Sequence, residues 1–185
     1  MSADQQYPMF IPPSGLWQRD RTTWGKQEAD RYFAWLMSCK DQRVRSMLGF
    51  LGMSEAGACD SCGHLLAVGR AALSQFRNQK FATTDGGVGY LTNTGYALAA
   101  DLGLLLADHL IRKGGDRIKW KIRRGGKTHI SYNMPVLIGF GPGEPSTVDP
   151  ILASIGLAGS VVSGRRDERA WVEAFESLVP RIPVI

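Results

Sequence analysis

The chain has 185 residues, of which 44% are hydrophobic and 21% charged, and its formal net charge is +5. This composition is typical of a soluble globular protein with a core large enough for one domain, and no apolar stretch is long enough to predict a membrane span or a secretory signal. Three cysteines in a chain without a predicted signal do not make a disulfide framework, so the sequence predicts a reducing, cytoplasmic setting.

The elements predicted first along the chain are an arm and two helical segments. Residues 1–15 hold three prolines and are expected to form an N-terminal arm, with a single α+β domain over residues 16–185. Apolar residues recur at three- and four-residue steps from Trp24 to Leu51, which predicts one long helix or two abutting ones. A second helix is predicted from about Leu65 to Phe76.

The next predicted element is a central helix. The glycine-rich segment 85–89 that precedes it lacks the lysine and hydroxyl of a phosphate-binding loop, so it is expected to be a flexible connector. Either Thr92 or Thr94 is suited to cap the helix, and Gly114-Gly115 ends it. Because this is the most apolar segment of the chain, we expect it to lie at the centre of the core.

After Gly115 the spacing of apolar residues changes from helical to alternating. Residues 118–123 and 129–132 flank Arg124-Gly-Gly-Lys127 and predict a β-hairpin, and residues 136–140 predict a third strand that Pro135 begins. A proline- and glycine-rich loop is expected over 141–150. The predicted fold class is therefore α+β, with a helical layer around the central apolar helix packed on a small antiparallel sheet made of the hairpin and one strand.

Two apolar stretches follow the predicted sheet. They cover residues 151–162 and 171–178, and the second has its apolar residues at helical spacing behind a charged first turn. The sequence contains no internal repeat that would divide the domain further.

Positive charge is concentrated in one window, residues 112–127. The window holds eight basic residues and one acidic residue, a net charge of +7, so the other 14 basic and 16 acidic residues give a net charge of −2. Cations alternate with Ile118, Trp120 and Ile122, as in a strand with one buried and one charged face. The candidate partner-binding residues are the basic side chains of the predicted hairpin: Arg117, Lys119, Lys121, Arg123, Arg124 and Lys127. The alternative is a solvated edge strand whose charges discourage aggregation.

No residue pattern predicts a catalytic, metal or cofactor site. Cys59 and Cys62 have the spacing of two zinc ligands, but a closed site needs four, and Cys39 lies in another predicted helix. Asp101 and Asp108 lie on roughly one face of the central helix, where paired carboxylates can do acid–base chemistry. The alternative, which we prefer, pairs Asp108 with Arg112 and leaves Asp101 hydrogen-bonded to backbone or hydroxyl groups. Since no serine lies in a Gly-x-Ser-x-Gly turn, we do not expect an enzyme.

Several segments, taken in order, resemble a known family. These are Trp24-Gly-Lys-Gln-Glu-Ala-Asp-Arg-Tyr-Phe-Ala-Trp-Leu36 with Arg43 and Leu48, then Ala99-Ala-Asp-Leu-Gly103 with Lys119-Trp120, then Tyr132-Asn-Met-Pro-Val-Leu-Ile-Gly-Phe140 and Asp149-Pro-Ile151. They are similar to landmarks of bacterial immunity proteins of contact-dependent inhibition and other polymorphic toxin systems. The resemblance covers about residues 12–151, and it includes neither catalytic residues nor the Cys59 and Cys62 pair.

The resemblance implies a cytoplasmic protein that binds the toxin C-terminal domain of its own system and neutralises it. Many such toxins are nucleases with basic clefts, so their inhibitors are commonly acidic. Either the toxin surface met by this basic chain is acidic, or the acidic remainder of the chain makes the contact. A second hypothesis is a nucleic-acid-binding regulatory protein that uses the basic hairpin 117–132.

Overall fold

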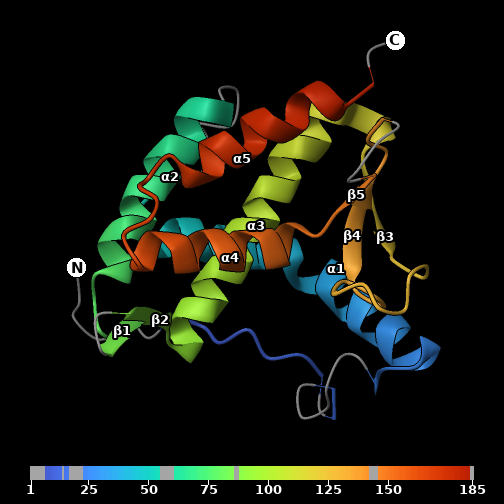
Figure 1. Ribbon diagram of the computed structural model, residues 1–185, viewed down its shortest axis with the longest axis horizontal. Coiled ribbons are helices and arrows are strands. Elements are labelled where there is room, and N and C mark those ends of the chain that lie inside the picture. The colour runs from blue at the N-terminus through green and yellow to red at the C-terminus, as the bar shows by residue number, and fades with distance from the viewer. Residues whose placement is uncertain are drawn as a thin grey trace.

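The computed structural model describes residues 7–13, 15–16, 23–54, 61–85, 88–141 and 146–183. It confirms the predicted α+β class: α-helices make up most of the regular structure, and the described strands form two small antiparallel sheets (Figure 1). Within the described residues, every helix is too short or too polar to cross a membrane.

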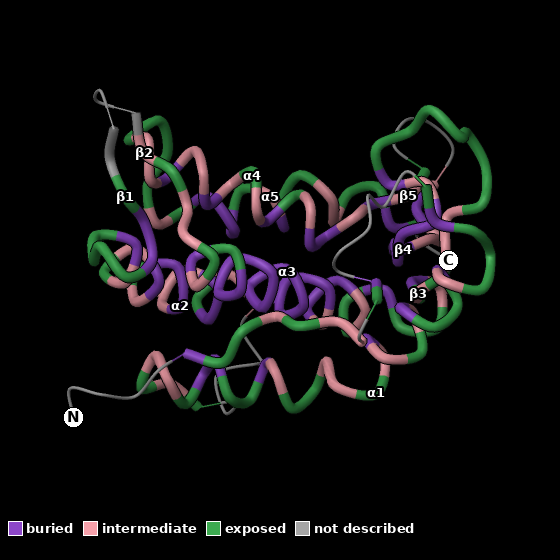
Figure 2. Tube along the Cα trace, turned by 90° about the horizontal axis from the view of Figure 1, so that it is seen from below, coloured by how far each residue is buried: buried purple, intermediate pink, exposed green. Residues whose placement is uncertain are grey.

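Helix α3 (Asn93–Gly114) is the centre of the core, as predicted. Of the two candidate caps, Thr92 is the one used: its Oγ1 accepts a hydrogen bond from the Gly95 N–H at 3.1 Å. The helix ends at Gly115, whose φ of 56° suits a residue without a side chain. Figure 2 shows α3 as a largely buried helix between α1 on one side and α4 and α5 on the other.

The other helices surround α3. The first predicted segment is one helix, α1 (Lys26–Phe50), and α2 (Ser61–Phe76) follows it. Helix α4 (Pro150–Val162) begins at an Asp149 cap, whose Oδ1 accepts from the Leu152 N–H at 2.9 Å. Helix α5 (Ala170–Leu178) packs beside α2. The two apolar stretches near the C-terminus are therefore both helices.

The main sheet has the strand order β3–β4–β5, and its hairpin differs from the predicted one. Strand β3 (Lys119–Ile122) pairs with β4 (Pro135–Ile138) in the register Lys119 opposite Ile138. The predicted second hairpin strand, 129–132, instead forms turns within a long loop between β3 and β4. The strand predicted third, at residues 136–140, is β4 and pairs directly with β3. The remaining strand of this sheet is β5 (Thr147–Val148), which pairs with β4 and lies in a segment that was predicted to be a loop.

A second sheet was not predicted. Strand β1 (Ala82–Asp85) pairs with β2 (Val88–Leu91), so Asp85, Val88 and Gly89 of the glycine-rich segment belong to paired strands, where a flexible connector was expected. Gly89 is required there, because a Cβ at this position would lie 2.7 Å from the Val162 carbonyl oxygen of α4. The close contact places the β1–β2 hairpin against the end of α4.

Replacing Gly139 with alanine is expected to destabilise the junction between β4 and the short helix η3 (Gly115–Arg117). Gly139 has a φ of 104°, and an added Cβ would lie 1.8 Å from the Arg117 carbonyl oxygen. We expect a loss of about 2–3 kcal/mol in the free energy of unfolding, measured by urea denaturation. Gly156→Ala is the control. Gly156 lies in helix α4, and a Cβ added there meets no other atom within 4 Å, so this variant should gain roughly 0.5–1 kcal/mol in the free energy of unfolding. Equal changes in the two variants would contradict the account.

Candidate functional site

Three of the six predicted partner-binding residues have partners inside the protein. Arg117 donates from Nε to the Gly114 carbonyl oxygen at 2.9 Å and also bonds the Pro183 carbonyl oxygen. Arg123 is half-buried and donates to the Thr147 hydroxyl on β5. Arg124 donates to Asn133 Oδ1 at 2.9 Å and forms an ion pair with Asp30 at 2.6 Å. Arg123 and Arg124 therefore join the sheet, the loop after β3 and α1, whereas Arg117 joins η3 to the end of α3 and to the C-terminal segment.

The other three predicted residues, Lys119, Lys121 and Lys127, are exposed. In the described part of the chain, no carboxylate forms an ion pair with any of them. Ile130, in the same loop as Lys127, is 72% exposed, the highest value for a described large hydrophobic residue. We call Lys119, Lys121, Lys127 and Ile130 the basic surface. It combines lysines that have no described ion-pair partner with an apolar side chain that is largely exposed.

Trp120 does not offer a stacking platform to this surface. It is half-buried, packs against the core, and its indole Nε1 is buried. The strand therefore has the alternation that was predicted, with lysines outside and Trp120 and Ile122 inside. A surface of this kind attracts acidic partners by charge but lacks the exposed aromatic rings that bind single-stranded nucleic acid.

Asp101 lies at the centre of a buried polar cluster between the N-terminal arm, α1 and α3. Its Oδ1 accepts from Arg43 Nε at 2.6 Å, and its Oδ2 accepts from Arg43 Nη2 at 2.8 Å and from the Tyr7 hydroxyl at 2.5 Å. Arg43 also donates to the carbonyl oxygens of Met9 and Pro8 at 3.0 and 3.3 Å, with its guanidinium 4.6 Å from the Phe10 ring centre. The cluster fastens residues 7–10 of the arm to the core.

This geometry gives Asp101 a structural role. The carboxylate is only 1% exposed and is enclosed by Arg43 and Tyr7, so a substrate cannot reach it. Burial raises the pKa of Asp101, while the hydrogen bonds and charge of Arg43 and the bond from Tyr7 lower it. Burial also raises the pKa of Tyr7, and the neighbouring Asp101 adds to this effect. The predicted hydroxyl partner is confirmed as Tyr7, whereas the Arg43 partner was not predicted.

Asp108 lies seven residues further along α3 and does not join this cluster. Its carboxylate is 4.0 Å from Lys40 Nζ on α1. Because Asp101 is enclosed by Arg43 and Tyr7, the two carboxylates do not share a site open to a substrate.

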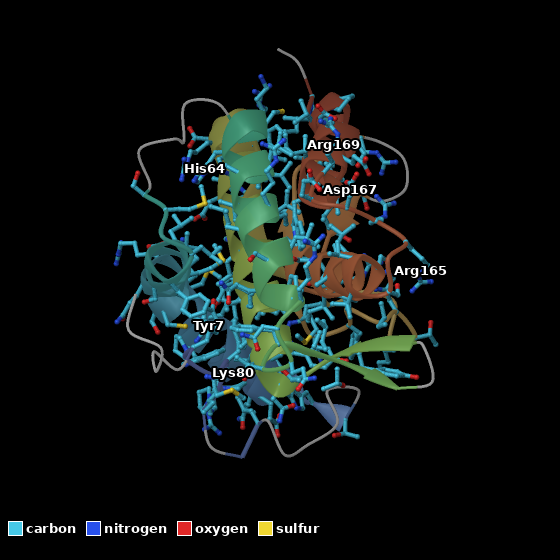
Figure 3. The ribbon with its side chains drawn as sticks, turned by 90° about the vertical axis from the view of Figure 1, so that its left-hand side faces the viewer. Tyr7, His64, Lys80, Arg165, Asp167 and Arg169 are labelled. Atoms are coloured by element: carbon cyan, nitrogen blue, oxygen red, sulfur yellow. The ribbon has the colours of Figure 1, made fainter. Side chains whose placement is uncertain are left out.

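A second buried cluster links α2 to α3 through two histidines. His64 Nδ1 is 3.0 Å from His109 Nε2, and His109 Nδ1 is 2.9 Å from the Ser61 hydroxyl oxygen. His109 is fully buried and His64 is 5% exposed, while Ser61 is half-buried. Figure 3 labels His64 and Tyr7, which belong to the two clusters and lie well apart in the molecule.

Both histidines are held in the neutral form. Burial lowers the pKa of His109 to about 4, and the nearby His64 and Arg112 act in the same direction. Burial also lowers the pKa of His64, again with a contribution from Arg112. The imidazole Nε2 of His64 is buried and has no partner in good hydrogen-bond geometry among the described residues, although the Ser54 backbone acts on His64 in the opposite direction and raises its pKa.

The histidine pair predicts a loss of stability on mild acidification. Because the pKa of His109 is about 4 in the folded protein and 6.5 in the reference state, the unfolded chain binds more protons between these values. From pH 7 to pH 5, His109 should therefore remove about 2 kcal/mol from the free energy of unfolding. Urea denaturation of the wild type and of His109→Gln at both pH values isolates this term. An equal pH dependence in the two proteins would contradict it.

The cysteines do not form a metal site with these histidines in the described part of the chain. Cys59 lies outside the described residues. Cys62 Sγ is 3.9 Å from Glu176 Oε1 on α5, whereas His64 extends toward His109 on α3. Among the residues that the structure describes, no three histidine, cysteine or acidic side chains converge as metal ligands.

Sequence reasoning missed the Ser61–His64–His109 cluster. The partners are 45 and 48 residues apart, and no motif connects them. One signal was present: His109 interrupts the run of apolar residues in the central helix, and a buried polar side chain requires a partner.

Comparison with protein-family models, curated proteins and solved structures found no match to this chain.

Proposed function

We propose that this chain is an immunity protein that binds and neutralises the toxin domain of its own polymorphic toxin system. The observation that carries the proposal is the basic surface, in which Lys119, Lys121 and Lys127 have no described ion-pair partner and Ile130 is 72% exposed. Protein interfaces combine an apolar contact with a charged rim, and the charges select the partner and speed association. The toxin surface that it meets is accordingly acidic.

The residues that carry the family resemblance support this proposal as a framework. Asp101 fastens the arm, Pro135 begins β4, and Asp149 caps α4. All three are structural, as expected of a protein whose partners vary while its scaffold stays the same. The proposal places the chain in the cytoplasm, where the toxin would act.

The experiment that tests the function uses the gene next to this one. We expect a large reading frame immediately upstream, and its C-terminal domain should stop bacterial growth when produced alone. Co-production of this chain should restore growth, and the two purified proteins should elute as a one-to-one complex. Continued growth arrest with no complex at micromolar concentrations would refute the proposal. Binding to generic duplex DNA at low salt, with no effect on the toxin, would instead favour the nucleic-acid hypothesis.

A further inference from the structure

The Ser61–His109–His64 cluster has the connectivity of an activated nucleophile. Ser61 in the first turn of α2 contacts a ring nitrogen of His109, and the other ring nitrogen of His109 contacts His64. When the Ser61 hydroxyl donates to His109 Nδ1, the proton of His109 lies on Nε2 and is donated to His64 Nδ1. A nucleophile bonded to a base, with the base oriented by a third group, is the arrangement that activates serine in acyl transfer.

The Ser61 hydroxyl also borders a pocket. This pocket has a volume of about 440 Å³, and besides Ser61 it is lined by apolar Phe175, Val179 and Pro180, by charged Lys113 and Glu176, and by Cys62. Phe175, Val179 and Pro180 give this mixed pocket an apolar part that fits a short acyl chain.

We propose that Ser61 is an acyl-accepting nucleophile, with His109 as its base and His64 as the residue that positions His109. Ser61 Oγ attacks the carbonyl carbon of a small activated ester, and its proton passes to His109 Nδ1. His109 then gives this proton to the departing alkoxide, which leaves as the alcohol. Water hydrolyses the acyl-serine by the reverse proton transfers, so that one ester and one water give one acid and one alcohol.

The reaction is slow, because a buried imidazolium near Arg112 is unfavourable. A single covalent event is therefore the appropriate measurement. The activity is separate from toxin binding, since Ser61, His109 and His64 are not part of the basic surface.

The test is labelling of the full chain with a fluorophosphonate probe, followed by intact-mass measurement and peptide mapping. The wild type should gain one adduct, at Ser61, with release of fluoride. Ser61→Ala should gain none, whereas Ser74→Ala, which changes an exposed serine of the same helix, should label like the wild type. His109→Gln should label roughly 100-fold more slowly at Ser61, since a positioned base contributes a factor of this size.

Circular dichroism of each variant separates a chemical effect from unfolding. A wild type that gains no adduct, or an adduct on another residue, would overturn the proposal. Equal labelling rates in folded His109→Gln and wild type would overturn it as well, because a serine exposed by chance needs no base. Ser61→Ala should still bind the toxin domain, so failure of this proposal and failure of the immunity function are distinguishable.

Discussion

Replacing Arg43 with methionine is expected to lower the free energy of unfolding by about 3–5 kcal/mol. The substitution removes both hydrogen bonds to Asp101, whose carboxylate is 1% exposed and would be left buried with Tyr7 as its remaining known partner. It also removes the bonds to the carbonyl oxygens of Pro8 and Met9, so residues 8–10 should loosen while Tyr7 stays packed against Phe50 and Phe81. Urea denaturation gives the free energy of unfolding, and limited proteolysis reports the loosening of residues 8–10.

A double variant shows whether the effect comes from the stranded carboxylate. Asp101→Asn in the Arg43→Met background removes the buried charge, and it should recover part of the lost stability. Arg45→Met is the control, because Arg45 is exposed on the same helix. A loss below about 1 kcal/mol in Arg43→Met would show that the cluster is not a major source of stability.

Reversing the charge of Lys119, Lys121 and Lys127 to glutamate is expected to weaken the toxin complex by about 100-fold in Kd. These lysines have no described ion-pair partner, so the variant should keep the wild-type free energy of unfolding within about 1 kcal/mol. Arg117, Arg123 and Arg124 are left unchanged, because their internal bonds would confuse lost binding with lost structure. Titration calorimetry measures the affinity.

The matched control reverses three exposed cations elsewhere. Arg77, Lys80 and Arg169 lie beyond the end of α2 and before α5, and their replacement by glutamate changes the net charge by the same amount. A control that binds like the wild type would place the effect on the basic surface. Equal weakening in both variants would show that net charge alone attracts the toxin, and unchanged affinity in the lysine variant would exclude the basic surface from the interface.

The helices were predictable because their signals are local. A run of leucines, a threonine cap and two glycines define α3, and three- and four-residue spacing defines α1. The alternation of lysines with Trp120 and Ile122 likewise predicted β3.

The strand pairing was not predictable in the same way. Residues 129–132 alternate like a strand, but the backbone turns at Asn133, with a φ of 61°, before β4 begins. The β1–β2 hairpin packs against α4 where Gly89 approaches Val162, a contact that is distant in sequence. Strand β5 is only two residues long, too short to give a pattern. Pairing depends on tertiary packing that no short window of sequence contains.

The candidate sites likewise contain features that local sequence predicts and features that only tertiary packing creates. The exposed lysines were identifiable from charge and alternation alone. Which arginines have internal partners was not, because Arg124 meets Asp30 across 94 residues of sequence and Arg123 reaches Thr147. The partners of Asp101 and His109 are also distant in sequence, and their polar side chains come together only when α1, α2 and α3 pack.

Hydrogen–deuterium exchange of the chain alone and in complex with the upstream-encoded toxin domain tests most directly whether the basic surface is the interface. We expect the amides of residues 119–130 to exchange more slowly in the complex, while those of α2 and the α4–α5 connection stay unchanged. Protection confined to another face of the molecule, with residues 119–130 exchanging as in the free protein, would contradict the account.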